Sequence, residues 1–210
     1  MITTALIRVV DDDESLRNAL LRLLAAAGFE ACGYASTGDF LLHPRPDRPG
    51  CLLLDVRLPG PSGLELQAAR QAQGVALPVI FLTGYADVSS SVRAMKAGAV
   101  DFLAKPIARD TLFDALRRAL ALDALQRSAR DKARQLRAGF ASLTLREREV
   151  FDRIVAGRLN KQIADEMAIS ERTVKAERAQ CMAKLRVNSA AELGRLAERL
   201  QQLSGDQVEG

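Results

Sequence analysis

The chain has 210 residues, nearly half of them hydrophobic, which is enough to bury a core and favours two modest domains. No apolar run approaches the roughly 20 residues needed to cross a bilayer, and the first residues lack the basic start and cleavage site of a signal peptide. We therefore expect a cytoplasmic protein with no membrane partner. The three cysteines form no C-x-x-C pair and His43 is the single histidine, which argues against a disulfide framework, a zinc site and a histidine-based catalytic dyad.

Charge is distributed unevenly along the chain. Residues 1–125 carry 13 Lys and Arg against 14 Asp and Glu, whereas residues 126–210 carry 17 against 12. The basic C-terminal part favours a polyanionic partner, although a solvated helical surface gives the same count.

The first 125 residues alternate between strand-like and helix-like segments. Between the strands, apolar residues recur at helical spacing, as at positions 16, 20 and 23, at 88, 92 and 95, and at 112, 116 and 120. This alternation predicts right-handed βαβ units and an α/β fold with a doubly wound, five-stranded parallel sheet. The predicted strands are residues 5–10, 30–35, 51–56, 78–84 and 101–105.

Four of these strands end in polar side chains. Asp11 and Asp12 follow the first strand, while Asp55, Thr83 and Lys105 lie at the ends of the third, fourth and fifth. The carboxyl ends of parallel strands meet at one edge of a sheet, where such folds place their chemistry. The sequence therefore predicts an acidic pocket at this edge.

The predicted pocket contains the groups needed for phosphoryl chemistry. Mg²⁺ prefers oxygen ligands and keeps several waters, so Asp12 and Asp55 suit it. An aspartate can also attack phosphorus and become an aspartyl phosphate, provided that cations such as the metal and Lys105 neutralise the transferring group. The Thr83 hydroxyl can then donate to the new phosphoryl group and move its loop. An aspartyl-phosphate phosphatase of the haloacid dehalogenase kind would use similar chemistry, but its D-x-D motif is absent because Arg57 stands two residues after Asp55.

The motifs VVDDDE, LLLDVRLPGPSGLEL, VIFLTGYADV and VRAMKAGAVDFLAKP, spread over about residues 4–123, resemble the receiver domain of two-component response regulators. The resemblance implies that Asp55 accepts a phosphoryl group from a sensor histidine kinase. It implies that Asp11 and Asp12 hold Mg²⁺ or Mn²⁺, Asp11 through water, with Asp55 and the backbone carbonyl of Arg57 as further ligands.

The same resemblance assigns roles to residues beside the pocket. Thr83 matches the switch hydroxyl, Lys105 the phosphate-contacting lysine, and Phe102 the aromatic residue whose rotamer reports the switch. Pro106 is expected to follow a cis peptide bond. The implied protein is a regulator rather than an enzyme, because its only catalysis is the autocatalytic gain and loss of its own phosphoryl group.

The remainder of the chain contains only helical patterns. No Gly or Pro occurs between Arg109 and Gly139, which predicts that the last helix of a receiver domain over residues 1–123 continues as an exposed linker helix over 124–141. Residues 142–203 predict a four-helix unit, and the polar tail 204–210 is expected to fray. In the first helix of this unit the residues at core spacing are Leu145, Val150, Ile154 and Val155.

Two helices of this unit, separated by a tight turn, predict a helix-turn-helix whose second helix, Glu171–Leu185, lies in the DNA major groove. Asn160 and Lys161 begin the preceding helix, where backbone N–H groups and a cation favour a phosphate. Val174, Cys181 and Leu185 fall on the inward face. The residues predicted to face DNA are Arg172, Thr173, Lys175, Ala176, Arg178 and Ala179.

The T-x-R-E and N-K-x-I-A…S-x-R-T-V-K features over about residues 142–203 are similar to the LuxR-type DNA-binding domain. A receiver followed by this domain resembles the NarL/FixJ class, most closely its FixJ-type branch. This implies a phosphorylation-activated transcription regulator that binds promoter double-stranded DNA and works with RNA polymerase. One departure is Glu177, which stands where the family usually has histidine. A C-terminal unit that binds protein or RNA instead is the second alternative.

Homodimerisation on phosphorylation is also implied by the resemblance. In FixJ-like receivers the fourth helix and fifth strand form the dimer face, which corresponds here to Val92, Lys96 and Asp101. The C-terminal helix, with Leu193, Leu196 and Leu200, resembles the dimer helix of the output domain.

Overall fold

The structure is a computed structural model that describes residues 5–43, 48–72, 77–84, 92 and 94–205. The chain forms two compact units, Met1–Ser128 and Ala129–Gly210. Within the described ranges there is no helix with the length and apolarity required to span a membrane.

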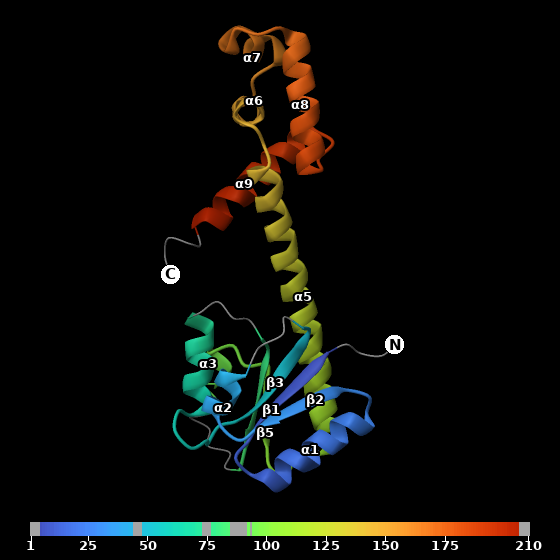
Figure 1. Ribbon diagram of the computed structural model, residues 1–210, viewed down its shortest axis with the longest axis vertical. Coiled ribbons are helices and arrows are strands. Elements are labelled where there is room, and N and C mark those ends of the chain that lie inside the picture. Colours follow the sequence, from blue (N-terminus) through green and yellow to red (C-terminus); the bar gives the residue numbers. More distant parts are fainter. Residues whose placement is uncertain (1–4, 44–47, 73–76, 85–91, 93, 206–210) are drawn as a thin grey trace. The chain divides into compact units, whose positions relative to one another are not determined.

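The N-terminal unit is built on a parallel sheet (Figure 1). The sheet has five strands in the order β2-β1-β3-β4-β5. The predicted doubly wound sheet is therefore confirmed, and every strand begins and ends within one residue of its predicted range. The strands are β1 (Leu6–Val10), β2 (Glu30–Tyr34), β3 (Gly50–Asp55), β4 (Val79–Thr83) and β5 (Asp101–Ala104).

Helices cover both faces of the sheet, with α1 and α5 on one face and α2 and α3 on the other (Figure 1). Ile7 and Val9 of β1 pack against α1 and α5, while Val10 contributes to the core beneath α2 and α3 because successive strand residues point to opposite faces. Residues 92 and 94–96 are helical, whereas Val88 lies outside the described residues. The helices are α1 (Glu14–Ala26), α2 (Thr37–Leu42), α3 (Gly63–Ala72) and α5 (Arg109–Ala141).

A buried carboxylate fixes α5 to the sheet. Asp123 accepts hydrogen bonds through Oδ2 from the Gly50 N–H and from Arg127 Nε, both at 2.9 Å. Arg127 also donates to the Arg48 carbonyl at 2.6 Å. At Gly50 a Cβ would lie 2.0 Å from the Leu6 carbonyl oxygen, so only glycine lets the start of β3 lie this close to the backbone of β1. The network anchors α5 where its first half ends.

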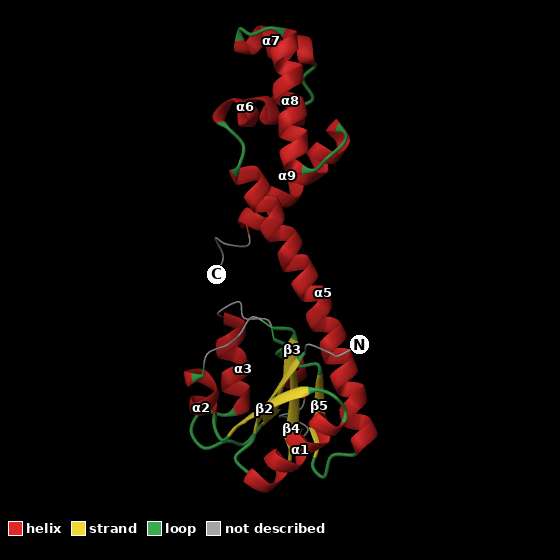
Figure 2. Ribbon diagram, turned by 45° about the vertical axis from the view of Figure 1, so that its right-hand side comes forward, coloured by secondary structure: helices red, strands yellow, loops and turns green. Residues whose placement is uncertain are grey.

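The C-terminal unit contains four further helices and the last turns of α5 (Figure 2). Leu136 and Phe140 of α5 pack against the core formed by Leu143, Phe151 and Leu193. This part of α5 is therefore a core element, and the expectation of an exposed linker is wrong for these two residues. The helices are α6 (Leu145–Val155), α7 (Asn160–Met167), α8 (Glu171–Leu185) and α9 (Ala190–Gly205), the last of which extends into the tail expected to fray.

Two of the core residues predicted for α6 are on its surface. Leu145 is 83% exposed and Val155 39% exposed, while Val150, Phe151 and Ile154 are buried. Leu145 is the first residue of the helix and extends beyond the packed turns, and Val155 is rotated about 100° from Ile154. The apolar stripe is therefore narrower than the sequence pattern predicts.

The start of α6 is held by Glu147, which the T-x-R-E feature contains but to which sequence reasoning gave no structural role. Its carboxylate is buried and accepts the Thr144 N–H at 2.6 Å, while Thr144 Oγ1 accepts the Glu147 N–H at 3.1 Å, forming a capping box. Lys184 of α8 donates to the same carboxylate at 2.6 Å. The Lys184 hydrogen bond lowers the pKa of Glu147 below its ordinary value, and the cap acts in the same direction. The Thr-x-x-Glu spacing was the available signal.

Candidate functional site

The strand ends bring the predicted pocket residues together. Lys105 Nζ donates to Asp11 Oδ2 at 2.8 Å and to Asp55 Oδ2 at 2.5 Å, bridging the two carboxylates. Carboxylate oxygens of Asp11, Asp12 and Asp55 all lie within 4.8 Å of one another. Asp11 and Asp55 are buried and Asp12 is exposed, so the cluster is accessible from the side of Asp12.

The register of the sheet explains this convergence. Val10 pairs with Leu54, so Asp11 and Asp55 come next on neighbouring strands. Asp55 pairs with Leu82, which places the buried Thr83 one residue further along β4. The Lys105 N–H then donates to the Thr83 carbonyl at 2.7 Å. Four adjacent strands thus deliver their terminal side chains to one edge.

Backbone groups orient both buried carboxylates. Asp11 Oδ1 accepts the Asp13 N–H at 3.0 Å, and Asp55 Oδ1 accepts the Arg57 N–H at 2.9 Å. In each carboxylate the other oxygen is left to Lys105. The predicted cis bond between Lys105 and Pro106 is present.

Burial and ion pairing shift the pKa values of two members of the cluster. Burial raises the pKa of Asp11, outweighing the hydrogen bond from Lys105. Burial opposes the charge of Lys105, but its hydrogen bonds to Asp11 and Asp55 outweigh that effect and raise its pKa. Lys105 therefore stays cationic near neutral pH. A cluster of three carboxyl groups with an exposed member is a donor set that fits a hard divalent cation such as Mg²⁺.

Phe102 and the residues assigned to dimerisation lie outside the pocket. Phe102 is partly buried in β5, and its ring lies 6.2 Å from that of Phe81. Val92 and Lys96 are exposed, whereas Asp101 is partly buried and forms an ion pair with Arg118.

The leucines predicted for an output dimer contact are internal. Leu193 and Leu196 are buried in the core of the C-terminal unit, and Leu200 packs against that core. These side chains support α9 within its own chain.

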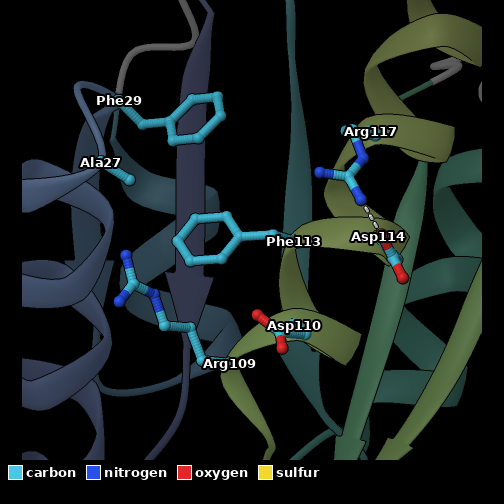
Figure 3. Close-up of a pocket in the computed structure, with 7 residues that line it drawn as sticks. All are labelled: Ala27, Phe29, Arg109, Asp110, Phe113, Asp114 and Arg117. Atoms are coloured by element: carbon cyan, nitrogen blue, oxygen red, sulfur yellow. Dashed lines mark hydrogen bonds and ion pairs between the residues drawn. The ribbon is translucent and has the colours of Figure 1, made fainter.

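A hollow of about 610 Å³ between α1 and α5 is separate from the pocket (Figure 3). The rings of Phe29 and Phe113 stack there at 6.3 Å, and the Arg109 guanidinium lies 5.7 Å from the Phe113 ring. Arg117 pairs with Asp114. No residue of the strand-end cluster lines this hollow, so it takes no part in the chemistry of that cluster.

The predicted DNA-facing surface is formed by α8 and the start of α7. Val174, Cys181 and Leu185 are buried, as the sequence predicts for the inward face. Ser170 caps α8 by accepting the Thr173 N–H at 3.1 Å. Lys161 is exposed, and so are the α8 residues Arg172, Lys175, Ala176 and Ala179.

Two members of this surface interact with each other. Arg178 donates to Asn160 Oδ1 at 3.2 Å, which joins α8 to the beginning of α7. Thr173, Arg178 and Asn160 are partly buried. Glu177 is also partly buried, and among the described residues it has no ion-pair partner, so Arg178 does not neutralise it.

Comparison with known families accounts for both units. Residues 7–117 match the family described as response regulator receiver domain, and residues 141–197 match the family described as bacterial regulatory proteins, luxR family.

Relatives and solved structures match nearly the whole chain. Nodulation protein W of Bradyrhizobium diazoefficiens is 41% identical, over 94% of this chain and 87% of its own length. The transcriptional regulatory protein FixJ of the same organism is 40% identical, over 95% of this chain and 97% of its own. The structure of response regulator StyR has 45% identity and a TM-score of 0.84, covering 93% of this chain and 99% of that one.

Proposed function

Because this chain belongs to the response regulators of two-component systems, with a receiver domain followed by a LuxR-type DNA-binding domain, we propose that phosphorylation of Asp55 controls its binding to promoter DNA. The observation that carries the proposal is the lysine bridge between Asp11 and Asp55 at the sheet edge. We assign the receiver to residues 1–123 and the DNA-binding domain to 142–203. The segment 124–141 between them is a linker helix whose Leu136 and Phe140 also pack on the core of the C-terminal unit. The donor is the phosphohistidine of a sensor kinase.

In the proposed transfer, a carboxylate oxygen of Asp55 forms a bond to phosphorus while the bond from phosphorus to the histidine nitrogen of the kinase breaks. Lys105 already lies against the attacking carboxylate and would stabilise the negative charge of the phosphoryl group. Thr83 would donate its hydroxyl to the product. Mg²⁺ or Mn²⁺, held by Asp11, Asp12, Asp55 and the Arg57 carbonyl, would supply further charge neutralisation when bound.

The receiver gains its phosphoryl group by this step and loses it when water attacks phosphorus and releases inorganic phosphate. Both steps take place on its own aspartate, so the chain is a switch rather than an enzyme with turnover. The proposed readout includes reorientation of Phe102 and dimerisation through Val92, Lys96 and Asp101. Because Asp101 pairs with Arg118, a dimer through this face would have to share or replace that ion pair. Association with RNA polymerase and a cytoplasmic location complete the proposal.

Asp55→Asn tests the phosphoacceptor. Asparagine keeps the shape of the side chain but lacks the nucleophilic carboxylate, so labelling by a radioactive small phosphodonor should be lost. Asp13→Asn is the matched control, because Asp13 caps α1 and asparagine caps equally well. Undiminished labelling of the Asp55 variant would overturn the assignment.

Lys175→Ala tests the DNA-facing surface. Loss of one phosphate contact should weaken binding to all promoter fragments and reduce the slope of log affinity against log salt by about one. Lys132→Ala removes another exposed lysine, from α5, and should leave gel-shift affinity unchanged. If RNA displaces the promoter fragment as well as double-stranded DNA does, the result would support the alternative that the C-terminal unit binds RNA.

A further inference from the structure

A groove of about 680 Å³ in the C-terminal unit lies between the end of α5, the turn joining α8 to α9, and α9 itself. Leu136, Leu185, Val187 and Leu196 give it an apolar floor. Leu185 and Leu196 also belong to the core of the unit, so the floor is held by packed helices.

Four cationic side chains surround this floor: Lys132, Arg186, Arg195 and Arg199. All four are exposed, and within the described part of the chain none has an ion-pair partner. The groove contains one carboxylate, that of Glu192, which accepts the Asn188 N–H at 2.7 Å. The groove is therefore an apolar channel with an unbalanced positive rim.

Arg186 occupies a backbone position that usually favours glycine. It follows α8 with φ of +54°, in the left-handed region where a residue with a Cβ is disfavoured. The chain thus places a long cationic side chain on the groove rim where glycine would satisfy the local backbone better. Replacing Arg186 with glycine should therefore remove a positive charge from the groove rim without disturbing the fold.

The charge and position of the groove decide among possible occupants. Along α8, Leu185 lies about 15 Å from Lys175 at 1.5 Å per residue, so the groove is beyond the residues proposed to read DNA. An apolar floor offers nothing to a phosphodiester backbone. A second copy seated symmetrically would set the cationic rim against itself, which is repulsive.

We propose that this groove binds an acidic amphipathic helix of a partner protein. Apolar side chains of the helix at spacings of three and four residues would lie on the leucine floor, and flanking carboxylates would pair with Arg186, Arg195 and Arg199. The proposal goes beyond DNA binding and does not depend on it, because α8 can contact DNA through its first half while the groove holds a protein.

The probe is a fluorescent synthetic peptide of roughly 16 residues, with leucines on one helical face and glutamates beside them. A second peptide carries glutamine in place of each glutamate. Fluorescence anisotropy with the full chain should show binding of the acidic peptide that weakens as salt rises, and at least about tenfold weaker binding of the glutamine peptide. Equal binding of both peptides would overturn the charge argument.

Variants locate the binding. The double substitution R195E/R199E, and separately Arg186→Gly, should each lower affinity for the acidic peptide, the double substitution by at least about tenfold. Arg186→Gly should not lower the melting temperature, because glycine accepts the positive φ. Arg146→Glu reverses an exposed charge on α6, outside the groove, and should leave affinity unchanged.

Three further outcomes would overturn the proposal: unchanged binding by both groove variants, displacement of the peptide by a short DNA duplex, or self-association of the full chain that blocks the peptide. Lys175→Ala should leave peptide binding intact. Failure of this proposal is thus distinguishable from failure of the DNA-binding assignment.

Discussion

Glu147 and Lys184 form an ion pair in which the carboxylate is buried and the ammonium reaches solvent. Removing one partner should therefore change the free energy of unfolding by a different amount than removing the other. The Glu147 side chain is 1% exposed, whereas that of Lys184 is 34% exposed. Lys184→Met leaves a carboxylate buried without its cation, whereas Glu147→Gln leaves an ammonium that can reach water. We expect Lys184→Met to cost about 3 kcal/mol. Glu147→Gln should cost about 1.4 kcal/mol, because glutamine still accepts the Thr144 N–H.

Hydrogen exchange measured by mass spectrometry suits this test, since the chain has no tryptophan and neither tyrosine, Tyr34 nor Tyr85, is in the C-terminal unit. The relevant amides are those of α6 and α8 that exchange through opening of the unit. Because each 1.4 kcal/mol changes an equilibrium constant tenfold, these amides should exchange about 100-fold faster in Lys184→Met and about tenfold faster in Glu147→Gln. If the lysine substitution accelerates exchange no more than the glutamine one, the reasoning from burial is wrong.

The same pair predicts a pH dependence. The folded pKa of Glu147 is lowered, so its stabilising contribution is complete above the ordinary value of 4.5 and is lost as the pH falls through the folded value. Exchange in α6 should therefore accelerate on acidification, after correction for intrinsic rates, more in the natural chain than in Glu147→Gln. Equal acceleration would contradict the assignment.

Gly63→Ala should destabilise the receiver by about 3 kcal/mol and weaken phosphodonor labelling, because a Cβ there would lie 2.3 Å from the Asp55 carbonyl oxygen. Urea unfolding followed by tyrosine fluorescence measures the loss of stability. A change below about 1 kcal/mol would refute the prediction. Mg²⁺ affinity measured by calorimetry should fall on acidification with a midpoint above 3.8, the ordinary aspartate pKa, because burial raises the pKa of Asp11 and protons compete with the metal. An affinity independent of pH down to that value would exclude Asp11 as a ligand.

Sequence reasoning located the strand-end cluster because each member ends an apolar run, and parallel strands bring such ends to one edge. The strand boundaries are local signals of this kind, whereas the cis bond before Pro106 was expected from the resemblance to receiver domains. The geometry that joins Lys105 to both Asp11 and Asp55 then follows from the register.

Interactions between distant helices were not predictable in the same way. Helical spacing identified an apolar stripe on α6 but not its width, so Leu145 and Val155 were wrongly placed in the core. The hydrogen bond between Arg178 and Asn160 depends on how α7 and α8 cross, and no pattern along the chain encodes it. The groove beside α9 likewise arises only when residues from three segments pack together.

The helix α5 is shared between two hydrophobic cores, and this constrains how such proteins can be cut or recombined. Leu112 and Leu116 complete the core of one unit, while Leu136 and Phe140 complete the core of the other. A fragment that begins at residue 142 would discard part of its own interior. The exposed run 128–132 is the better joint, so an exchange of output modules among regulators of this kind should preserve everything that follows it as one inherited piece.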